Sequence, residues 1–586
     1  MWEKLIRSGK LRVWTKTIMI LFFLALLLWI ARYWHFKDFG LYEDDLTVIP
    51  NVMGMTSSQY FDLLIDHLGM LHPHGRPLSN SFIYTFTFLG NGKSFNDLYL
   101  FGFGIETLNL VLFYYLLKRL FDEKFAVIGG ISFVLFSADT TQAYLTHAYA
   151  LHPTLLFLLL AFHSYLSGKR WLLYIFGVLI LFTYEASYFI LLAAPLLSLR
   201  WDKKLLKELG INTVLLFLII AGVYVFRSSV GDFRSIDLTV NNLLITPVLH
   251  MIEGPIVAMG TYLYRPLQAI RAINSEVGIA ILGSFIVFVL VLTRIFSGES
   301  DNSNEFIDSI RRNKFSALRE SIKNRRYPSQ FPTHLKRLVK LTIIGIIFIV
   351  LAYPLTFTVR AYAISGRDTR VHFAAVVGAA ILCTCLSKLL FSISEYYKHR
   401  RIMIVSMSLL FAFLMGYGFV IQRDYINAWD YQQEFWREIV RITSDADEGT
   451  VILVEPTGLK YTRQIDANTW NLPRVLDQIY KYPSDWEDPP RVYRLVPGWQ
   501  DHILGESGQF IVNASTTIAP AVLYREIPST DVIFIETYSG RLSRRTEPLV
   551  LFGKSYELYK TPAHVVMYDE NVLYDFLVGS DLLNGD

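Results

Sequence analysis

A series of apolar segments constrains the fold of this chain more than any other feature. The first, residues 17–34, is almost entirely apolar, and about 20 such residues cross a bilayer as a helix. Segments 171–184 and 186–199 are short and can instead form one bent helix. In all, about eleven spans are predicted: 17–34, 98–117, 124–138, 147–166, 171–184, 186–199, 209–226, 277–296, 341–358, 371–390 and 402–421.

The composition supports a polytopic membrane protein. Of the 586 residues, 53% are hydrophobic and 18% are charged, whereas about 25% are charged in soluble domains. A net charge of +4 on so long a chain gives no indication of a nucleic-acid partner. The first apolar segment is long and no small-residue cleavage site follows it, so we expect an uncleaved anchor.

Basic residues predict the orientation. They gather at alternate loops, on the same side as the basic N-terminus, and the positive-inside rule makes that side cytoplasmic. We therefore expect a multi-pass protein of the plasma membrane, within the cell envelope, with a cytoplasmic N-terminus. The outer side then holds 35–97, 139–146, Glu185, 227–276, 360–370 and the chain after Arg423.

The sequence changes character near residue 424. Apolar residues become short alternating runs separated by turn residues, which is typical of strands. Before them, Trp429, Gln432 and Trp436 recur at helical spacing. We therefore predict an α-helical membrane domain, 1–423, and an extracytoplasmic α/β domain, 424–586. The runs that predict strands are Thr450–Val454, Arg491–Val496, Asp531–Glu536 and Pro548–Phe552.

Three adjacent carboxylates, Glu43, Asp44 and Asp45, follow the first span closely. Charge at the boundary between lipid and water is costly, which favours a function. A carboxylate there can accept a proton from a hydroxyl nucleophile or bind a divalent cation. The alternative is a solvated acidic end of a loop.

Arg76 heads an apolar stretch in the same outer loop. An arginine can hold a phosphate or carboxylate through two parallel hydrogen bonds. His72 and His74 can join the acidic cluster at a metal, but we favour a turn at Pro73 and Pro77 as the reason for this pattern.

Two further outer segments carry unexpected charge. Glu185 interrupts an apolar run, which costs at least about 2.5 kcal/mol at mid-membrane unless it is compensated; it is either the structural partner of an arginine or an active-site group. Arg360, Arg367 and Arg370 lie in an outward loop, against the positive-inside trend, and predict an anionic ligand such as a lipid phosphate. A salt-bridged turn is the alternative.

These segments together resemble GT-C membrane glycosyltransferases, in particular protein O-mannosyltransferases and their relatives with tetratricopeptide repeats. Leu41–Asp45 followed by Asn51 is similar to the first-loop motif of that family, and Gly75–Leu78 to its Arg-Pro-Leu segment. No tetratricopeptide repeats follow here. Further similar segments are Leu135–Ala143, Thr183–Ser187 and Gly366–Asp368.

The resemblance implies a chemistry. The donor is a sugar on a polyprenyl phosphate or pyrophosphate in the membrane lipid, and displacement at the anomeric carbon is direct and inverting. The acceptor is a glycan, lipid or protein. Asp45 is the first choice for the general base and Asp44 the second. No cofactor is implied other than, as an alternative, a divalent cation at these carboxylates. Arg76, Arg367 and Arg370 would bind the donor phosphate, and Glu185, His74, His147 and Gln142 would line the cavity.

Two other classes of protein fit part of the pattern. A transporter or flippase of a lipid-linked glycan would use Glu185 and the outer arginines for coupled or anion transport. Such proteins usually place polar residues near the midplane and contain repeats, and neither is visible in this sequence. A non-catalytic assembly protein would use its outer domain to bind a partner.

Overall fold

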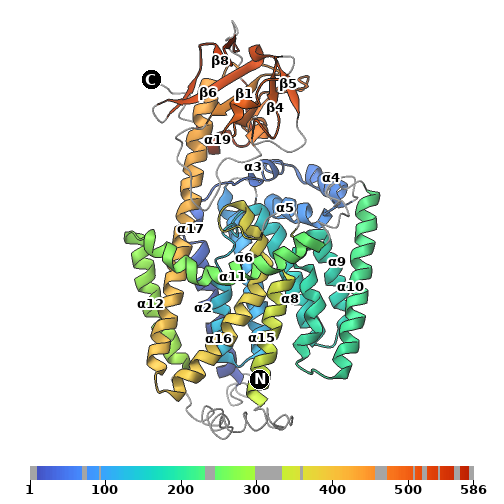
Figure 1. Ribbon diagram of the computed structural model, residues 1–586, viewed down its shortest axis with the longest axis vertical. Coiled ribbons are helices and arrows are strands. Elements are labelled where there is room, and N and C mark those ends of the chain that lie inside the picture. Colours follow the sequence, from blue (N-terminus) through green and yellow to red (C-terminus); the bar gives the residue numbers. More distant parts are fainter. Residues whose placement is uncertain are drawn as a thin grey trace.

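The computed structural model is a helical bundle with a small sheet domain at one end and the N-terminus at the other (Figure 1). The carboxylate-bearing loop after the first helix lies at the end that carries the sheet domain. The structure describes residues 10–68, 75–90, 94–230, 244–296, 333–356, 361–455, 472–505, 508–517, 524–538, 541–559 and 568–579.

Each of the predicted apolar segments overlaps a helix. Within the described residues, seven helices are long and apolar enough to cross a membrane, so the chain has the features of an integral membrane protein, and the count of eleven stays a prediction. These seven are α2 (Lys10–Arg32), α6 (Phe95–Leu120), α8 (Leu145–Leu166), α10 (Lys203–Ser229), α12 (Ser275–Phe296), η4 (Arg367–Ala375) with α16 (Val376–Tyr396), and α17 (Arg400–Ile442).

Shorter helices complete the bundle. Tyr184 has an extended backbone (φ −158°, ψ 115°), so the pair that could have formed one bent helix is two elements, α9 (Arg170–Thr183) and η2 (Glu185–Ser198). The others that overlap predicted spans are α7 (Glu123–Val134) and α15 (Thr333–Leu351).

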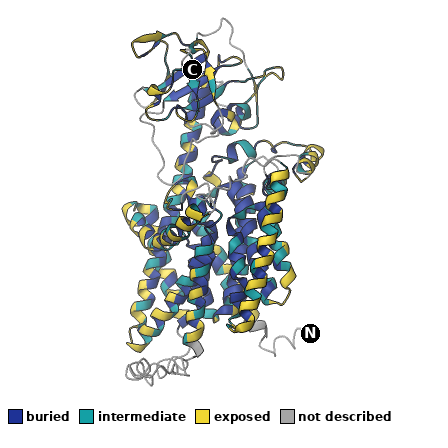
Figure 2. Ribbon diagram, turned by 45° about the vertical axis from the view of Figure 1, so that its right-hand side comes forward, coloured by how far each residue is buried: buried dark blue, intermediate teal, exposed yellow. Residues whose placement is uncertain are grey.

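Burial separates central from peripheral helices (Figure 2). In α8, 83% of the most apolar window is buried, whereas the same measure is 17% in α10 and in α12. Helix α7 is buried along almost its whole length. Its 12 residues are too few to cross a bilayer, and it packs inside the bundle between longer helices. The buried helices α7 and α8 therefore form the framework on which the loops at the sheet-domain end rest.

Helix α17 connects the bundle to the sheet domain. Its 43 residues extend about 65 Å, and it passes the predicted boundary at residue 424 without a break. The helical spacing of Trp429, Gln432 and Trp436 is confirmed, since all three lie on the buried side of this helix.

The C-terminal domain is built on a mixed sheet of order β3-β1-β6-β7. Strand β1 (Val451–Glu455) pairs in parallel with β3 (Arg491–Arg494) and β6 (Val532–Tyr538), and β7 (Arg541–Arg544) is antiparallel to β6. The predicted strand runs are confirmed, the last of them as β8. Smaller elements are β2 (Tyr480–Lys481) with β10 (Asp569–Glu570), β4 (Phe510–Val512) with β5 (Arg525–Ile527), β8 (Leu549–Leu551) with β9 (Lys554–Tyr556), α18 (Leu476–Ile479) and α19 (Tyr574–Leu577).

The loop after α2 packs under this domain. It contains α3 (Asp45–Val48), α4 (Ser57–Leu68) and α5 (Pro77–Leu89), and one hydrophobic cluster joins it to α17 and to the sheet domain. Gln432 Nε2 donates to the Leu41 carbonyl (2.9 Å), and Tyr42 Oη donates to the Tyr425 carbonyl (2.8 Å). Helix α17 therefore holds the acidic segment in place through these two hydrogen bonds.

Candidate functional site

The acidic segment is bent at Glu43. Its φ of 49° lies in the left-handed region, which costs a non-glycine residue about 1–3 kcal/mol and persists only where the surroundings enforce it. Helix α3 begins two residues later, at Asp45. The bend divides three consecutive carboxylates between two directions: Glu43 and Asp44 face Arg367, whereas Asp45 faces the beginning of α8.

Arg367 binds two of these carboxylates. Its Nε lies 3.1 Å from Glu43 Oε2, and its Nη2 donates to Asp44 Oδ2 at 3.0 Å. The segment that carries it is fixed by Thr369, whose Oγ1 accepts from the Thr140 amide at 3.0 Å. Residues more than 300 positions apart in the sequence thus form one charged group at the sheet-domain end of the bundle.

Arg370 lies one turn further along η4 and is half-buried. Its Nε is shielded from solvent, and within the described part of the chain Arg370 has no hydrogen-bond or ion-pair partner. Its charge and that of Arg367 act on the ring of His147, whose Nδ1 lies 2.9 Å from Thr141 Oγ1. Arg370 therefore offers a positive charge that no carboxylate in these ranges neutralises.

A second charged group surrounds Glu185. Arg76 Nε donates to Glu185 Oε2 at 2.9 Å and its Nη2 donates to Oε1, so this pair is bidentate. Arg227, at the end of α10, lies 3.5 Å from the same carboxylate. One carboxylate thus faces two guanidinium groups, and this group has an excess of positive charge. Arg227 was not among the residues predicted from the sequence, although it directly follows the apolar segment 209–226.

Tyr184 joins the two groups. The Arg76 guanidinium lies over its ring, 4.5 Å from the centroid, and Tyr184 also lies near Arg367. Its ring contacts Phe373 of η4, with centroids 5.9 Å apart. Glu43, Asp44, Arg76, Glu185, Arg227, Arg367 and Arg370 therefore lie in one region.

Asp45 has a different environment. It is fully buried, and its carboxylate accepts from the backbone amides of Tyr42 (3.3 Å), Leu145 (3.1 Å) and Thr146 (2.8 Å). Burial raises the pKa of Asp45 to about 7 although these amide donors oppose the shift. Leu145 is the first residue of α8, so Asp45 caps this central helix from a neighbouring segment.

Asp139 and Gln142 line a small inner cavity of about 50 Å³, which is room for a water molecule. Burial raises the pKa of Asp139 to about 6. The Thr141 amide and hydroxyl both donate to Asp139 Oδ1 at 2.8 Å, and the same hydroxyl contacts His147. Arg32 also lines the cavity. These contacts connect the cavity to the arginine region.

Several predicted residues are not part of this geometry. His72, His74 and Arg360 lie outside the described residues. Among the residues that are described, no three or more histidine, cysteine, aspartate or glutamate side chains are placed to hold a metal ion. The carboxylates of Glu43 and Asp44 are paired with a guanidinium group instead.

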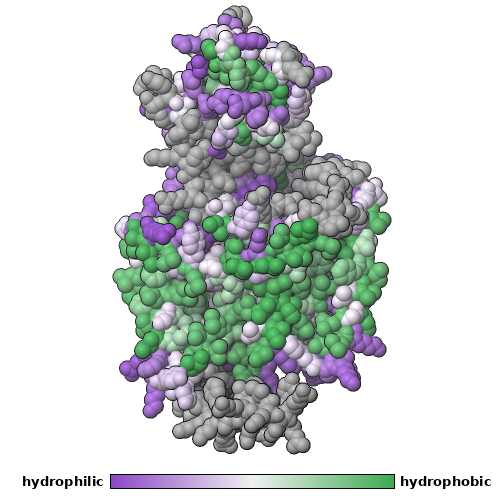
Figure 3. All heavy atoms as spheres, viewed as in Figure 1, coloured by the Kyte–Doolittle hydropathy of each residue, from purple (hydrophilic) through white to green (hydrophobic). Residues whose placement is uncertain are grey.

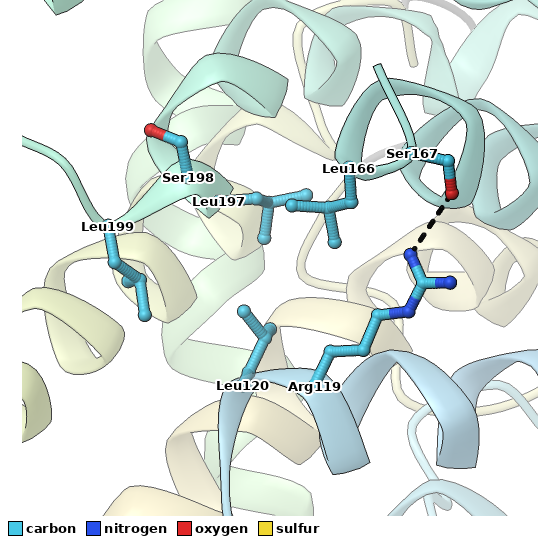
Figure 4. Close-up of a pocket in the computed structure, with 7 residues that line it drawn as sticks. All are labelled: Arg119, Leu120, Leu166, Ser167, Leu197, Ser198 and Leu199. Atoms are coloured by element: carbon cyan, nitrogen blue, oxygen red, sulfur yellow. Dashed lines mark hydrogen bonds between the residues drawn. The ribbon is translucent and has the colours of Figure 1, made fainter. Parts of the chain in front are cut away.

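A larger hollow of about 410 Å³ lies at the opposite end of the bundle (Figure 4). Among the described residues that line it, Arg119 alone is charged, and it donates to Ser167 Oγ at 3.3 Å. The described lining of this hollow therefore lacks the paired acid and base groups of the region around Asp44.

Comparisons with protein-family models, with curated protein sequences and with solved structures found no match. The similarity to GT-C glycosyltransferases therefore stays a prediction from short motifs. In the structure, the motif residues Asp44, Arg76, Glu185 and Arg367 come from four separate segments and lie in one region.

Proposed function

We propose that this protein is a membrane glycosyltransferase. It transfers a sugar from a polyprenyl-phosphate-linked donor to an acceptor hydroxyl, with inversion at the anomeric carbon, at the membrane face that carries the sheet domain. The observation that carries the proposal is Arg370, a half-buried arginine with no ionic partner among the described residues, one turn from the Asp44–Arg367 pair. This reaction needs an anion site next to a general base.

Asp44 is the general base in this proposal, ahead of Asp45. A base must come within about 2.6–3.2 Å of the hydroxyl it deprotonates. The Asp44 side chain is 25% exposed, whereas Asp45 is fully buried and occupied by three backbone amides. Asp45 then has a supporting role, since it holds the acidic segment against α8.

The reaction balances without an external acid. The acceptor oxygen attacks the anomeric carbon while its proton passes to Asp44. The bond between that carbon and the phosphate oxygen breaks, and the lipid phosphate leaves with the bonding electrons. Arg370, with Arg367 and Arg76 nearby, stabilises the charge that develops on the leaving phosphate. The proposed reaction uses no metal ion, because the carboxylates of Glu43 and Asp44 are paired with Arg367.

Membrane vesicles with labelled lipid-phosphate sugars test this proposal. We expect Asp44→Asn to lower the rate of transfer by about 10²–10⁴-fold, and Arg370→Gln to raise the KM for the donor. Asp62→Asn, an exposed carboxylate on α4, and Arg271→Gln, an exposed arginine, are the matched controls. Full transfer by Asp44→Asn at normal expression would refute the assignment of the base.

The orientation is part of the proposal. We place the N-terminus in the cytoplasm, the sheet domain outside, and the protein in the plasma membrane, on the basis of the basic loops. An impermeant thiol reagent on intact cells should label Val550→Cys, which is 63% exposed in the sheet domain. Labelling only after the cells are opened would reverse the orientation and would place the site in the cytosol.

A further inference from the structure

Helix α11 (Thr246–Arg271) has an unusual distribution of side chains. Its buried face carries polar and small residues, including His250, Gly254, Thr261 and the fully buried Arg265. Its exposed face is apolar, the reverse of a helix at a water-exposed surface. Its exposed aliphatic side chains are Val248, Leu249, Ile252, Ile256, Leu263, Leu267 and Ile270, which are 45–73% exposed.

The place of α11 in the bundle explains this distribution. It runs across the upper part of the bundle, at the end nearest the sheet domain, whereas α12 runs along the bundle (Figure 1). The apolar band of the surface continues over the region where α11 lies (Figure 3). Helix α11 is not among the helices apolar enough to span a membrane. The apolar face is therefore continuous with the surface that the spanning helices present to lipid.

The opposite face of α11 binds the segment that carries the arginines. Arg265 Nε donates to the Ser137 carbonyl at 3.1 Å, and its Nη2 donates to the Ile364 carbonyl at 2.7 Å. Ile364 lies three residues before Arg367 in the sequence. His250 Nδ1 lies 3.0 Å from Thr356 Oγ1, which precedes this segment in the chain.

A close backbone contact reinforces this connection. Gly254 packs on Tyr353 so tightly that a Cβ would lie 2.4 Å from the tyrosine ring. Tyr353 Oη lies 2.8 Å from His372 Nδ1, and His372 Nε2 lies 2.8 Å from the Ala363 carbonyl. Helix α11 therefore contacts residues 361–375 near both ends, directly at Ile364 and through Tyr353 at His372.

We propose that α11 is an interfacial helix that lies in the plane of the membrane. Its apolar face enters the acyl chains of the leaflet nearest the sheet domain, and its buried face sets the depth of residues 361–375, and so of Arg367 and Arg370, relative to the bilayer surface. Lipid is the occupant because the apolar face continues the lipid-facing surface of the bundle. The inference does not depend on the proposed glycosyl transfer.

Nitroxide labels at exposed positions test the first part. The protein, with Cys383 and Cys385 replaced by alanine, is placed in lipid nanodiscs with single labels at Ile252, Ile256, Leu263 and Leu267. Collisions with oxygen and with a water-soluble nickel chelate give the depth of each label. We expect oxygen to dominate at all four positions, with similar depths along the helix. The comparison labels are Val550→Cys in the sheet domain and Ile279→Cys, Ile286→Cys and Leu290→Cys along α12.

Three other results would contradict an interfacial position of α11. A steady change in label depth along α11, like that expected along α12, would mean that α11 spans the membrane. Nickel accessibility equal to that of Val550→Cys would mean that the face is in water. Low accessibility to both reagents, with dipolar coupling between labels, would mean that a second copy of the chain covers it. Any of these outcomes overturns the proposal.

A label at Tyr362→Cys, which is 49% exposed, tests the second part. We expect Arg265→Gln to shift its depth and increase its mobility, while the label at Ile256 keeps its depth. Arg271→Gln, at the exposed end of α11, should leave both labels unchanged. Thr356→Val removes the contact with His250 and the hydrogen bond that Thr356 Oγ1 donates to the Tyr353 carbonyl at 2.7 Å, but keeps Arg265, and should give a smaller shift of the same kind. Unchanged spectra for both Arg265→Gln and Thr356→Val would refute the coupling.

Discussion

Asp45→Asn separates a structural carboxylate from a catalytic one. Burial raises the pKa of Asp45 from an ordinary 3.8 to about 7, so the folded chain binds this proton more strongly than the unfolded chain does. The stability that the protonated group contributes is complete below pH 3.8 and is lost as the pH rises through about 7. Asparagine keeps the shape and one acceptor oxygen, but it stays neutral at every pH.

The magnitude follows from the two pKa values. Between them the free energy of unfolding falls by about 1.4 kcal/mol for each pH unit. From pH 5 to pH 7 the wild type should therefore lose about 2–3 kcal/mol relative to Asp45→Asn. Solvent does not screen this carboxylate, because it is fully buried, so the whole free-energy difference should be observed. For a chain of 586 residues this corresponds to a shift in Tm of about 2 °C.

Thermal unfolding of the purified protein in detergent, followed by tryptophan fluorescence from pH 5 to pH 8, measures this difference. The gap in Tm between Asp45→Asn and wild type should widen as the pH rises. Asp62→Asn, an exposed carboxylate in the same loop, should parallel the wild type. A gap that does not change with pH would refute the structural role. So would a fully folded Asp45→Asn variant that cannot transfer sugar.

Two more substitutions test the packing of the site. Glu185→Gln leaves two arginines facing each other and should lower the free energy of unfolding by about 3–5 kcal/mol, which is measured as a lower Tm. Adding Arg227→Gln should recover part of the lost stability. An unchanged Tm in Glu185→Gln would contradict the buried pairing. Gly40→Ala places a Cβ 1.8 Å from the Trp429 ring and should cost about 1–3 kcal/mol. Gly104→Ala, with open space around it, is the control, and equal Tm values for the two variants would refute the close contact.

Local pattern predicted the elements well. Apolar length alone located the helices, because a backbone inside lipid must satisfy its own hydrogen bonds. Alternation located the strand runs that became β1, β3 and β6, because successive side chains of a strand face opposite sides. The helical spacing at Trp429 and Trp436 was also sufficient to predict a helix there, although not that this helix continues the span 402–421 without a break. These are properties of neighbouring residues, which a sequence displays directly.

The roles within the acidic cluster could not be predicted in the same way. Glu43, Asp44 and Asp45 are equivalent in sequence, and the left-handed backbone at Glu43 gives them different partners. That conformation is enforced by Arg367 on one side and the amides at the start of α8 on the other, both distant in the chain. A preference for Asp45 over Asp44 as the base therefore had no local basis.

The orientation of helix α11 could not be predicted from its own sequence either. The region 227–276 was expected to lie on the outer side, on the basis of the basic loops, and no helix was predicted in it. Glu253, Arg265, Pro255 and Pro266 lower its apolar character. Its apolar residues do lie on one face. The sequence alone does not show that this face points outward, because that depends on Arg265 being buried against carbonyls of other segments.

The acidic segment and the sheet domain are both attached to the C-terminal part of α17. The Leu41 carbonyl accepts from Gln432, and Tyr42 donates to the Tyr425 carbonyl, so α17 fixes the two residues directly before Glu43. Arg544 of β7 holds the sheet to the turn that follows α17, since its Nη1 donates to both oxygens of Asp445 at 2.7 and 2.8 Å. A ligand that tilts this domain would therefore move the carboxylates relative to Arg367, which is held from the other side by α11. The position of the carboxylates relative to Arg367 thus depends on α17 on one side and on α11 on the other.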